Sequence, residues 1–208
     1  MAEEARKLVY SSPIPRAALR PLKQPLWDTE NVASTPTATN QIIFFQRPIG
    51  QPLAAAPAAA KTLVDTNLNQ AAQLGTPREF DVWGFNVRIG CTVTLADYQT
   101  IVNQGLFQFF FGQGRPWLQV QLADVPTGSG ASGAVSFDGA AVATPHDLPV
   151  TGISSTKEMY PFTVKKNPVR IRSNETFSAQ ISWPNAAIAP VLFNRITVII
   201  RGIMYSSL

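Results

Sequence analysis

Charged side chains are scarce in this chain of 208 residues: Asp, Glu, Lys and Arg make up 14% of it, against 45% hydrophobic residues. Soluble domains average about 25% charged residues. A chain with so few ionic groups cannot coat its whole surface with them, so we expect partner proteins to cover part of that surface. The net charge of +4 is mild and the basic residues are dispersed, which does not predict nucleic-acid binding by itself.

Cysteine and histidine are nearly absent, with one of each, Cys91 and His146. A single cysteine excludes an intrachain disulfide, and no CxxC, HxxxH or HExxH spacing exists, which argues against zinc. Cys91 lies on the apolar parity of a predicted strand and is interpreted as a core residue. His146, between two prolines and beside Asp147, is interpreted as a loop histidine because no nucleophile is identifiable. We therefore expect no enzyme activity, cofactor, metal or small-molecule substrate.

Two glycine-rich stretches, Gly112–Gly114 and Gly128–Gly133, lack the Gly-Lys-Ser/Thr ending and the following helix of a phosphate-binding loop. They are interpreted as turns or loops. The carboxylates of the later loops do not follow an EF-hand spacing, and solvated loop carboxylates are the simpler interpretation. A Ca²⁺ site stays open among Asp124, Asp138, Asp147 and Glu158.

Long apolar runs are also lacking. The longest are far short of the ~20 residues that span a bilayer. The first residues, Met1 to Lys7, are not followed by the apolar run of a signal peptide. We therefore expect synthesis and assembly in the cytoplasm.

Proline divides the chain near residue 77, because nine of the 17 prolines lie at or before Pro77. The dense prolines of residues 13–25 disfavour a helix or a central strand and favour an extended conformation. We expect residues 1–76 to form an extended arm, with a short strand near 41–46, that becomes ordered on a neighbouring protein. The candidate assembly residues of this arm are Ile14, Leu19, Leu22, Leu26, Trp27, Phe44 and Phe45.

The arm also carries a loose group of positive charges. Glu3, Glu4, Asp28 and Glu30 lie nearby and offset them, whereas packaging arms usually carry denser runs of like charge. Docking on protein is therefore favoured, and weak contact with nucleic acid or an internal membrane is the alternative. The candidate basic contacts are Arg6, Lys7, Arg16, Arg20 and Lys23.

Alternation of apolar and polar residues begins after Pro77 and predicts strands. The odd positions from Trp83 to Val93 are apolar, and Phe80 and Val82 precede them on the opposite parity, which predicts a β-bulge near Val82–Trp83. A capping threonine and an apolar face predict one short helix near 95–103.

Further strands are predicted on either side of turn signals. Residues 106–111 and 117–122 flank a Gly/Pro turn and predict a hairpin. Residues 177–183 alternate, and 195–205 are apolar on both parities, as in a strand buried on both faces or covered by another chain. Weaker candidates are 134–137, 160–164 and 169–171. Strands without strand–helix alternation predict an all-β antiparallel sandwich over 77–208, a single jelly roll being favoured over an immunoglobulin-like sandwich.

The order of predicted elements from residue 61 to 206 is similar to that of a known class of proteins. Its pieces are residues 61–67 before the strands, a strand pair over 107–122 that leads into 124–126, the run 170–177 leading to 181–184, and a final strand over 195–205. In this layout the chain resembles phage virion proteins of the small jelly-roll capsid type. The resemblance implies a structural subunit of an icosahedral virus or phage capsid, located in the virion, with copies of itself and other virion proteins as partners.

Two alternatives stand beside this expectation. One is a minor vertex or cementing protein of the virion. The other is a jelly-roll module that binds carbohydrate through Trp117, Trp183 and Tyr160, although two of these aromatics fall within strands, where core packing explains them equally well.

Overall fold

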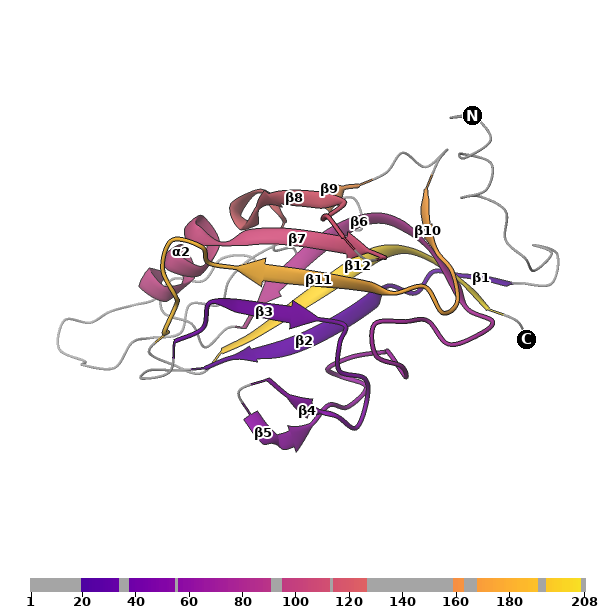
Figure 1. Ribbon diagram of the computed structural model, residues 1–208, viewed down its shortest axis with the longest axis horizontal. Coiled ribbons are helices and arrows are strands. Elements are labelled where there is room, and N and C mark those ends of the chain that lie inside the picture. Colours follow the sequence, from indigo (N-terminus) through magenta and orange to yellow (C-terminus); the bar gives the residue numbers. More distant parts are fainter. Residues whose placement is uncertain are drawn as a thin grey trace.

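The computed structural model describes residues 20–33, 38–54, 56–90, 95–112, 114–126, 159–162, 168–190 and 194–206. Within these ranges the chain is mostly β-strand, and its two main sheets pack face to face (Figure 1). The fold is thus an antiparallel β-sandwich, which confirms the predicted class. The helix predicted near 95–103 is α2 (Leu95–Gln104), at one end of the sandwich.

The larger sheet has six strands and is built around two long antiparallel strands, β6 (Glu79–Ile89) and β12 (Asn194–Ser206). Two strands pair with β12 and two with β6. They are β1 (Arg20–Leu22) and β2 (Leu26–Val32) on β12, and β9 (Tyr160–Pro161) and β10 (Val169–Ile171) on β6.

The smaller sheet has four strands in the order β3–β11–β7–β8. Its hairpin of β7 and β8 is the one predicted from the turn signal, and β11 shows the predicted alternation of burial. The strands are β3 (Gln41–Phe44), β7 (Leu106–Phe111), β8 (Leu118–Gln121) and β11 (Phe177–Ser182). A separate pair, β4 (Pro52–Leu53) and β5 (Ala56–Ala60), projects from one side, and the 3-10 helix η2 (Leu122–Asp124) follows β8 (Figure 1).

The main strands pair in a nested order. Leaving aside the short β1, the outermost pair joins β2 near the start of the chain to β12 at its end. Moving inward along the sequence, β3 pairs with β11, β6 with β10, and β7 with β8. One long hairpin rolled into two sheets pairs its strands in this way, so the order is compatible with a jelly roll. The immunoglobulin arrangement places its first two strands side by side in one sheet, whereas β2 and β3 lie in different sheets.

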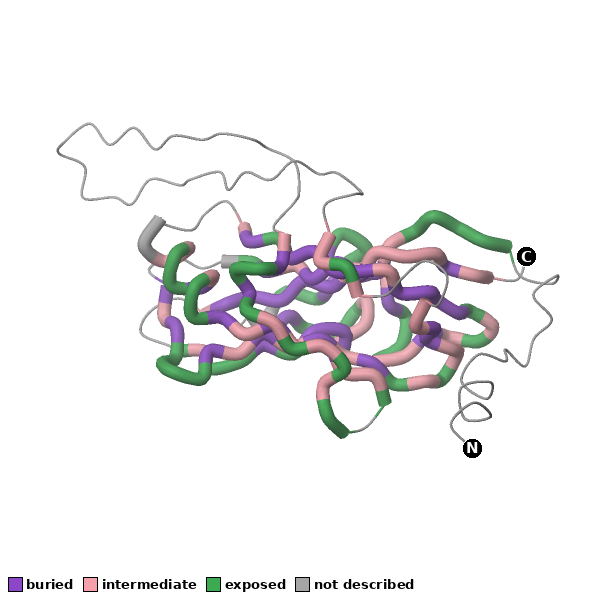
Figure 2. Tube along the Cα trace, turned by 90° about the horizontal axis from the view of Figure 1, so that it is seen from above, coloured by how far each residue is buried: buried purple, intermediate pink, exposed green. Residues whose placement is uncertain are grey.

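Aromatic side chains fill the space between the two sheets, where the buried residues concentrate (Figure 2). The ring of Phe85 on β6 lies 5.3 Å from that of Phe107 and 4.8 Å from that of Phe109, measured between centroids. The buried indole of Trp183 donates its N–H to the Ile101 carbonyl, 3.0 Å away. This bond fastens α2 to the end of the sandwich.

The predicted bulge lies in β6. Arg201 of β12 pairs with Gly84, and the next residue, Gly202, pairs with Val82, so Trp83 is the additional residue. Core-facing positions are even before Trp83 and odd after it, as the change of parity indicated. Trp83 itself, the additional residue, is only partly buried.

Much of the expected arm that the structure describes belongs to the sandwich, although β4 and β5 form a separate pair. β2 pairs along β12 and β3 pairs along β11. Leu26, Phe44 and Phe45 are fully buried, so the prediction that these three residues dock on a neighbouring protein was wrong. The boundary at residue 77 therefore does not separate an arm from a domain. The proline signal was extrapolated too far, because neither β2 nor β3 contains a proline.

Several predictions fall outside the described residues, and so do the residues they concern: Arg6, Lys7, Ile14, Arg16, Leu19, Cys91, Gly128–Gly133, the strand candidate 134–137, Asp138, His146, Asp147 and Glu158. Of the strand candidate 160–164, residues 160–161 form β9. Within the described ranges, no helix has the length and apolar character needed to cross a membrane.

Candidate functional site

The described residues contain no group of three or more His, Cys, Asp or Glu side chains placed to hold a metal ion. Of the seven charged residues that are buried in this part of the chain, six form two ion clusters, and the seventh, Asp65, pairs with Arg195.

The first ion cluster lies beside β2, next to β3. The Lys61 ammonium lies 2.6 Å from Asp28 Oδ1 and 2.7 Å from Glu30 Oε1, and the three side chains are fully buried. Asp28 Oδ2 accepts a hydrogen bond from the Phe45 N–H (2.6 Å), and Glu30 Oε2 accepts one from the Ala54 N–H (2.8 Å). Glu30 Oε1 contacts Lys61 as an ion pair without hydrogen-bond geometry, and the Arg47 guanidinium lies 3.2 Å from Glu30 Oε2 as a second cation. Each carboxylate oxygen thus lies against a cation or a backbone N–H, which identifies the cluster as structural.

Burial raises the pKa of Asp28 to about 6, although the nearby Lys61 ammonium acts to lower it. Desolvation of a carboxylate in the core opposes its ionisation, and only close positive charge and hydrogen bonds compensate. The cluster fastens the segments after β3 and around β4–β5 to β2. Nothing in the spacing of Asp28, Glu30 and Lys61 along the chain indicated that they would meet.

The second ion cluster joins the edge strand β10 to β6. Arg170 donates to both carboxylate oxygens of Asp81, at 2.5 and 2.7 Å, and to Glu79 at 3.3 Å. Its guanidinium carbon also lies 4.8 Å from the centre of the Tyr205 ring. The bonds to Asp81 raise the pKa of Arg170, so it stays charged. This cluster is structural too, because the bidentate pair fixes a strand of only three residues to its neighbour.

The outer face of the four-stranded sheet has an unusual composition: its four strands contain no charged residue at all. Alternate residues of each strand point away from the core. The cross-strand pairs place Ile43, Gln180, Gln108 and Gln119 in one row across the sheet. The complete outward set is Gln41, Ile43, Leu106, Gln108, Phe110, Gln119, Gln121, Ser178, Gln180 and Ser182, and we call it the uncharged face.

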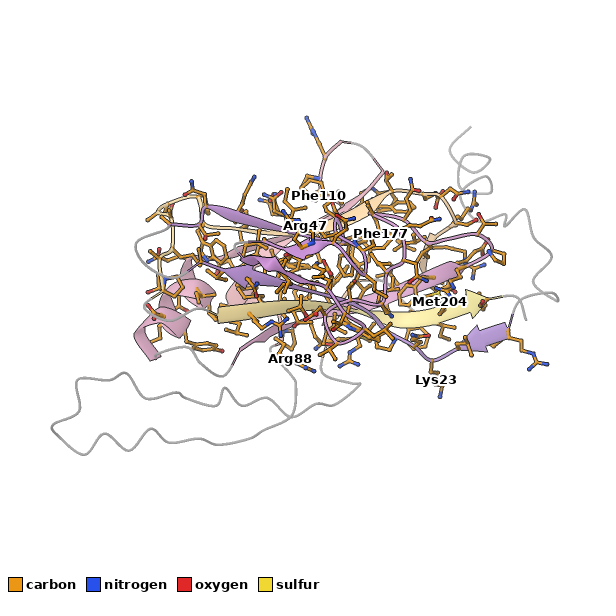
Figure 3. All side chains as sticks on the ribbon, turned by 90° about the horizontal axis from the view of Figure 1, so that it is seen from below. Lys23, Arg47, Arg88, Phe110, Phe177 and Met204 are labelled. Carbon is orange, nitrogen blue, oxygen red and sulfur yellow. The ribbon has the colours of Figure 1, made fainter. Side chains whose placement is uncertain are left out.

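Amide groups dominate the uncharged face. Gln108 donates to Gln119 Oε1 (3.0 Å), and Gln180 donates to Gln41 Oε1 (3.3 Å). A primary amide offers two donor hydrogens and two acceptor lone pairs, so each keeps bonding capacity for another surface. Ile43 is 39% exposed, and Phe110 is partly exposed and lies on the far side of the sandwich from Arg88 (Figure 3). Depletion of charge together with apolar anchors is typical of the centre of a protein–protein interface.

The structure places the predicted assembly residues on different parts of the molecule. Leu22 is 45% exposed near the start of the described chain. Trp27 is partly buried on the outer side of the six-stranded sheet. The basic residues Arg20 and Lys23 are exposed. Leu26, Phe44 and Phe45 lie in the core, so the predicted set does not form one surface. The uncharged face was not predicted, although the sequence carried a signal for it: four strand segments without Asp, Glu, Lys or Arg.

The aromatics proposed for carbohydrate binding do not share an exposed surface. Trp183 is 2% exposed and therefore belongs to the core. Trp117 is 52% exposed and packs edge-on against Phe111, with ring centroids 5.4 Å apart. Because the Trp183 ring is buried, it cannot stack on a sugar, and the carbohydrate-binding alternative loses one of its three proposed aromatic residues.

Comparison with known proteins gives no match: no family model, no curated protein and no solved structure is significantly similar to this chain. The functional argument therefore rests on residues and geometry.

Proposed function

We propose that the protein is a non-enzymatic structural subunit that assembles with copies of itself into the icosahedral capsid of a virus or phage. The uncharged face is the observation that carries the proposal. Two further features support it: the nested strand order is compatible with the jelly roll of such subunits, and only 14% of the residues are charged.

Self-association requires like-charged chains to approach each other. Each copy carries a net charge of +4, so contact through a charged surface would bring repulsion and a desolvation penalty. The uncharged face avoids both. Its amides donate and accept, so the face can form hydrogen bonds with a second copy of itself across a two-fold axis.

Ile43 and Phe110 supply the apolar part of such a contact. Covering the exposed 39% of Ile43 contributes about 1–2 kcal/mol at roughly 25 cal/mol per Å². In a two-fold contact the same gain is made twice. Such contacts are modest individually, and a closed shell multiplies them over many copies.

The proposed role is that of the major shell protein. A minor vertex or cementing protein would use the same face and differ in abundance. Electron microscopy of purified particles, matched with the band intensity of this chain, separates the two: many copies per particle indicate the shell protein, and a few dozen or fewer indicate the minor role.

Adding charge to the uncharged face tests the proposal. Gln41 and Gln119 are exposed, and each accepts its hydrogen bond through Oε1, which a glutamate retains. We expect the full-length protein to be oligomeric in size-exclusion chromatography with light scattering. The double variant Gln41→Glu/Gln119→Glu should shift towards monomer with an unchanged circular dichroism spectrum.

The matched control is Gln51→Glu/Gln70→Glu, which adds the same charge at exposed positions outside the four-stranded sheet. This control should assemble like the wild type. A wild-type chain that stays monomeric at tens of micromolar, or an oligomer that is indifferent to charge at Gln41 and Gln119, refutes the proposed role of this face.

A further inference from the structure

Exposed aliphatic side chains gather on the opposite side of the molecule, over the six-stranded sheet. Leu22 is 45% exposed, Leu63 68% and Val64 81%. Leu63 lines two shallow hollows, of about 330 and 190 Å³; Val64 lines the first and Leu22 the second. The three side chains therefore belong to one continuous surface.

Leu63 and Val64 occupy the tip of a fastened turn. Asp65 Oδ2 accepts hydrogen bonds from the Thr62 N–H (2.9 Å) and from the Thr62 hydroxyl (3.0 Å). The Asp65 carbonyl in turn accepts a bond from the N–H of Thr29 on β2, at 2.8 Å. Bonds at the base of the turn thus hold both aliphatic side chains outward, and their exposure is a fixed feature of the surface.

Positive charges surround these aliphatic residues. Arg88 and Arg201 line the hollow beside Val64, and Arg78 lines the hollow beside Leu22. Lys23 is exposed next to Leu22, and Lys23 and Arg88 lie on the same side of the sandwich, away from Phe110 (Figure 3).

No Asp or Glu is among the residues that line the two hollows. Arg201 donates to the Asn86 amide oxygen at 2.7 Å, which is a neutral partner. Burial and the neighbouring Arg88 guanidinium lower the pKa of Arg201, as expected where two positive charges lie close together. The hollow beside Val64 therefore presents two guanidinium groups to an external anion.

We propose that this surface docks on an anionic phospholipid bilayer. The basic aliphatic patch consists of Leu22, Lys23, Leu63, Val64, Arg78, Arg88 and Arg201. Leu63 and Val64 enter the boundary between headgroups and acyl chains, and the arginines bind lipid phosphates. The proposal goes beyond the assembly role and uses the surface of a single subunit.

A bilayer fits this chemistry better than the other polyanions do. Nucleic acid supplies phosphates but no apolar phase for a protruding aliphatic pair. An anionic membrane supplies both, since cations near its surface and apolar groups at its boundary each strengthen binding. Each cation within reach of the surface strengthens binding about fivefold, so removing two should weaken it roughly 30-fold.

Cosedimentation with vesicles tests the proposal on the full-length chain. The vesicles contain either phosphatidylcholine alone or phosphatidylcholine with about a quarter phosphatidylglycerol. We expect binding to the anionic vesicles only, weakened by added salt. Arg88→Gln/Arg201→Gln should weaken it about 30-fold, and Leu63→Ser/Val64→Ser about tenfold or more.

Controls of the same chemistry lie elsewhere on the described surface. Arg115→Gln removes an exposed cation, and Ile43→Ser removes an exposed aliphatic side chain from the uncharged face; both should bind vesicles like the wild type. The proposal is overturned if anionic vesicles do not bind, if patch and control variants behave alike, or if single-stranded DNA binds in preference to vesicles. Assembly is read separately by light scattering, so either proposal can fail without the other.

Discussion

The buried ammonium of Lys61 gives the sharpest test of how this fold is held together. Its two carboxylate neighbours, Asp28 and Glu30, lie within 2.7 Å and have no solvent access. The substitution Lys61→Met keeps the apolar length of the side chain and removes the charge. It leaves Asp28 without the ammonium and Glu30 with only the partly exposed Arg47 guanidinium, 3.2 Å away. Removing one partner of a buried ion pair typically lowers the free energy of unfolding by about 3–5 kcal/mol.

The stability lost in Lys61→Met should depend on pH, and the pKa of Asp28 indicates whether it grows or shrinks as the pH rises. Its folded value of about 6 exceeds the unfolded 3.8, so stability from this carboxyl is complete below pH 3.8 and is lost as the pH rises to about 6. That difference corresponds to about 3 kcal/mol. Removing Lys61 takes away the ammonium that lowers this pKa, so in the variant the loss continues to higher pH. The deficit of Lys61→Met should therefore be larger at pH 8 than at pH 5.

Urea unfolding followed by tryptophan fluorescence at pH 5 and pH 8 measures this deficit. Lys23→Met is the matched control, because Lys23 is exposed, and it should change stability by less than about 0.5 kcal/mol at either pH. A surface ion pair contributes at most about 1 kcal/mol. A deficit for Lys61→Met below that limit at pH 8, or an equal deficit at both pH values, would refute the reasoning.

Two further predictions concern the six-stranded sheet. Gly202→Ala should lower the free energy of unfolding, measured in urea, by about 2 kcal/mol or more. The reason is that the added Cβ would lie 1.9 Å from the Asp81 carbonyl oxygen. The control Gly75→Ala should leave stability nearly unchanged, because the nearest atom to its added Cβ would be 3.7 Å away. Arg170→Met should lower the free energy of unfolding by about 3–5 kcal/mol. Arg170→Lys should lower it less, because lysine keeps the charge but not the two parallel bonds to Asp81. Equal losses of stability in the two variants would contradict this account.

Local alternation was sufficient to predict most strands after residue 77. The period of two in 80–89, 106–111 and 177–182 matches the buried positions, and the parity change correctly located the bulge at Trp83. These features depend on neighbours in the chain, which a sequence displays directly. The hairpin of β7 and β8 was predictable for the same reason, since a short turn joins its strands.

Strands before residue 77 were misjudged because their partners are distant in the chain. β2 pairs with β12, which lies more than a hundred residues later, and no local pattern encodes that pairing. Residues 1–76 contain many prolines and little alternation, and they were therefore interpreted as an arm. The structure shows that part of it completes the core, as the burial of Leu26 and Phe44 demonstrates.

The sequence by itself determined that this is a charge-poor, strand-rich chain with one short helix and little histidine or cysteine. Composition and periodicity are properties of single residues and near neighbours, so no fold is needed to see them. Only the tertiary structure decided which strands pair, that Lys61 meets Asp28 and Glu30, and that one outer face is free of charge while the opposite one joins aliphatic side chains to arginines. Those arrangements bring together residues far apart in the chain, and sheet packing alone sets their neighbours.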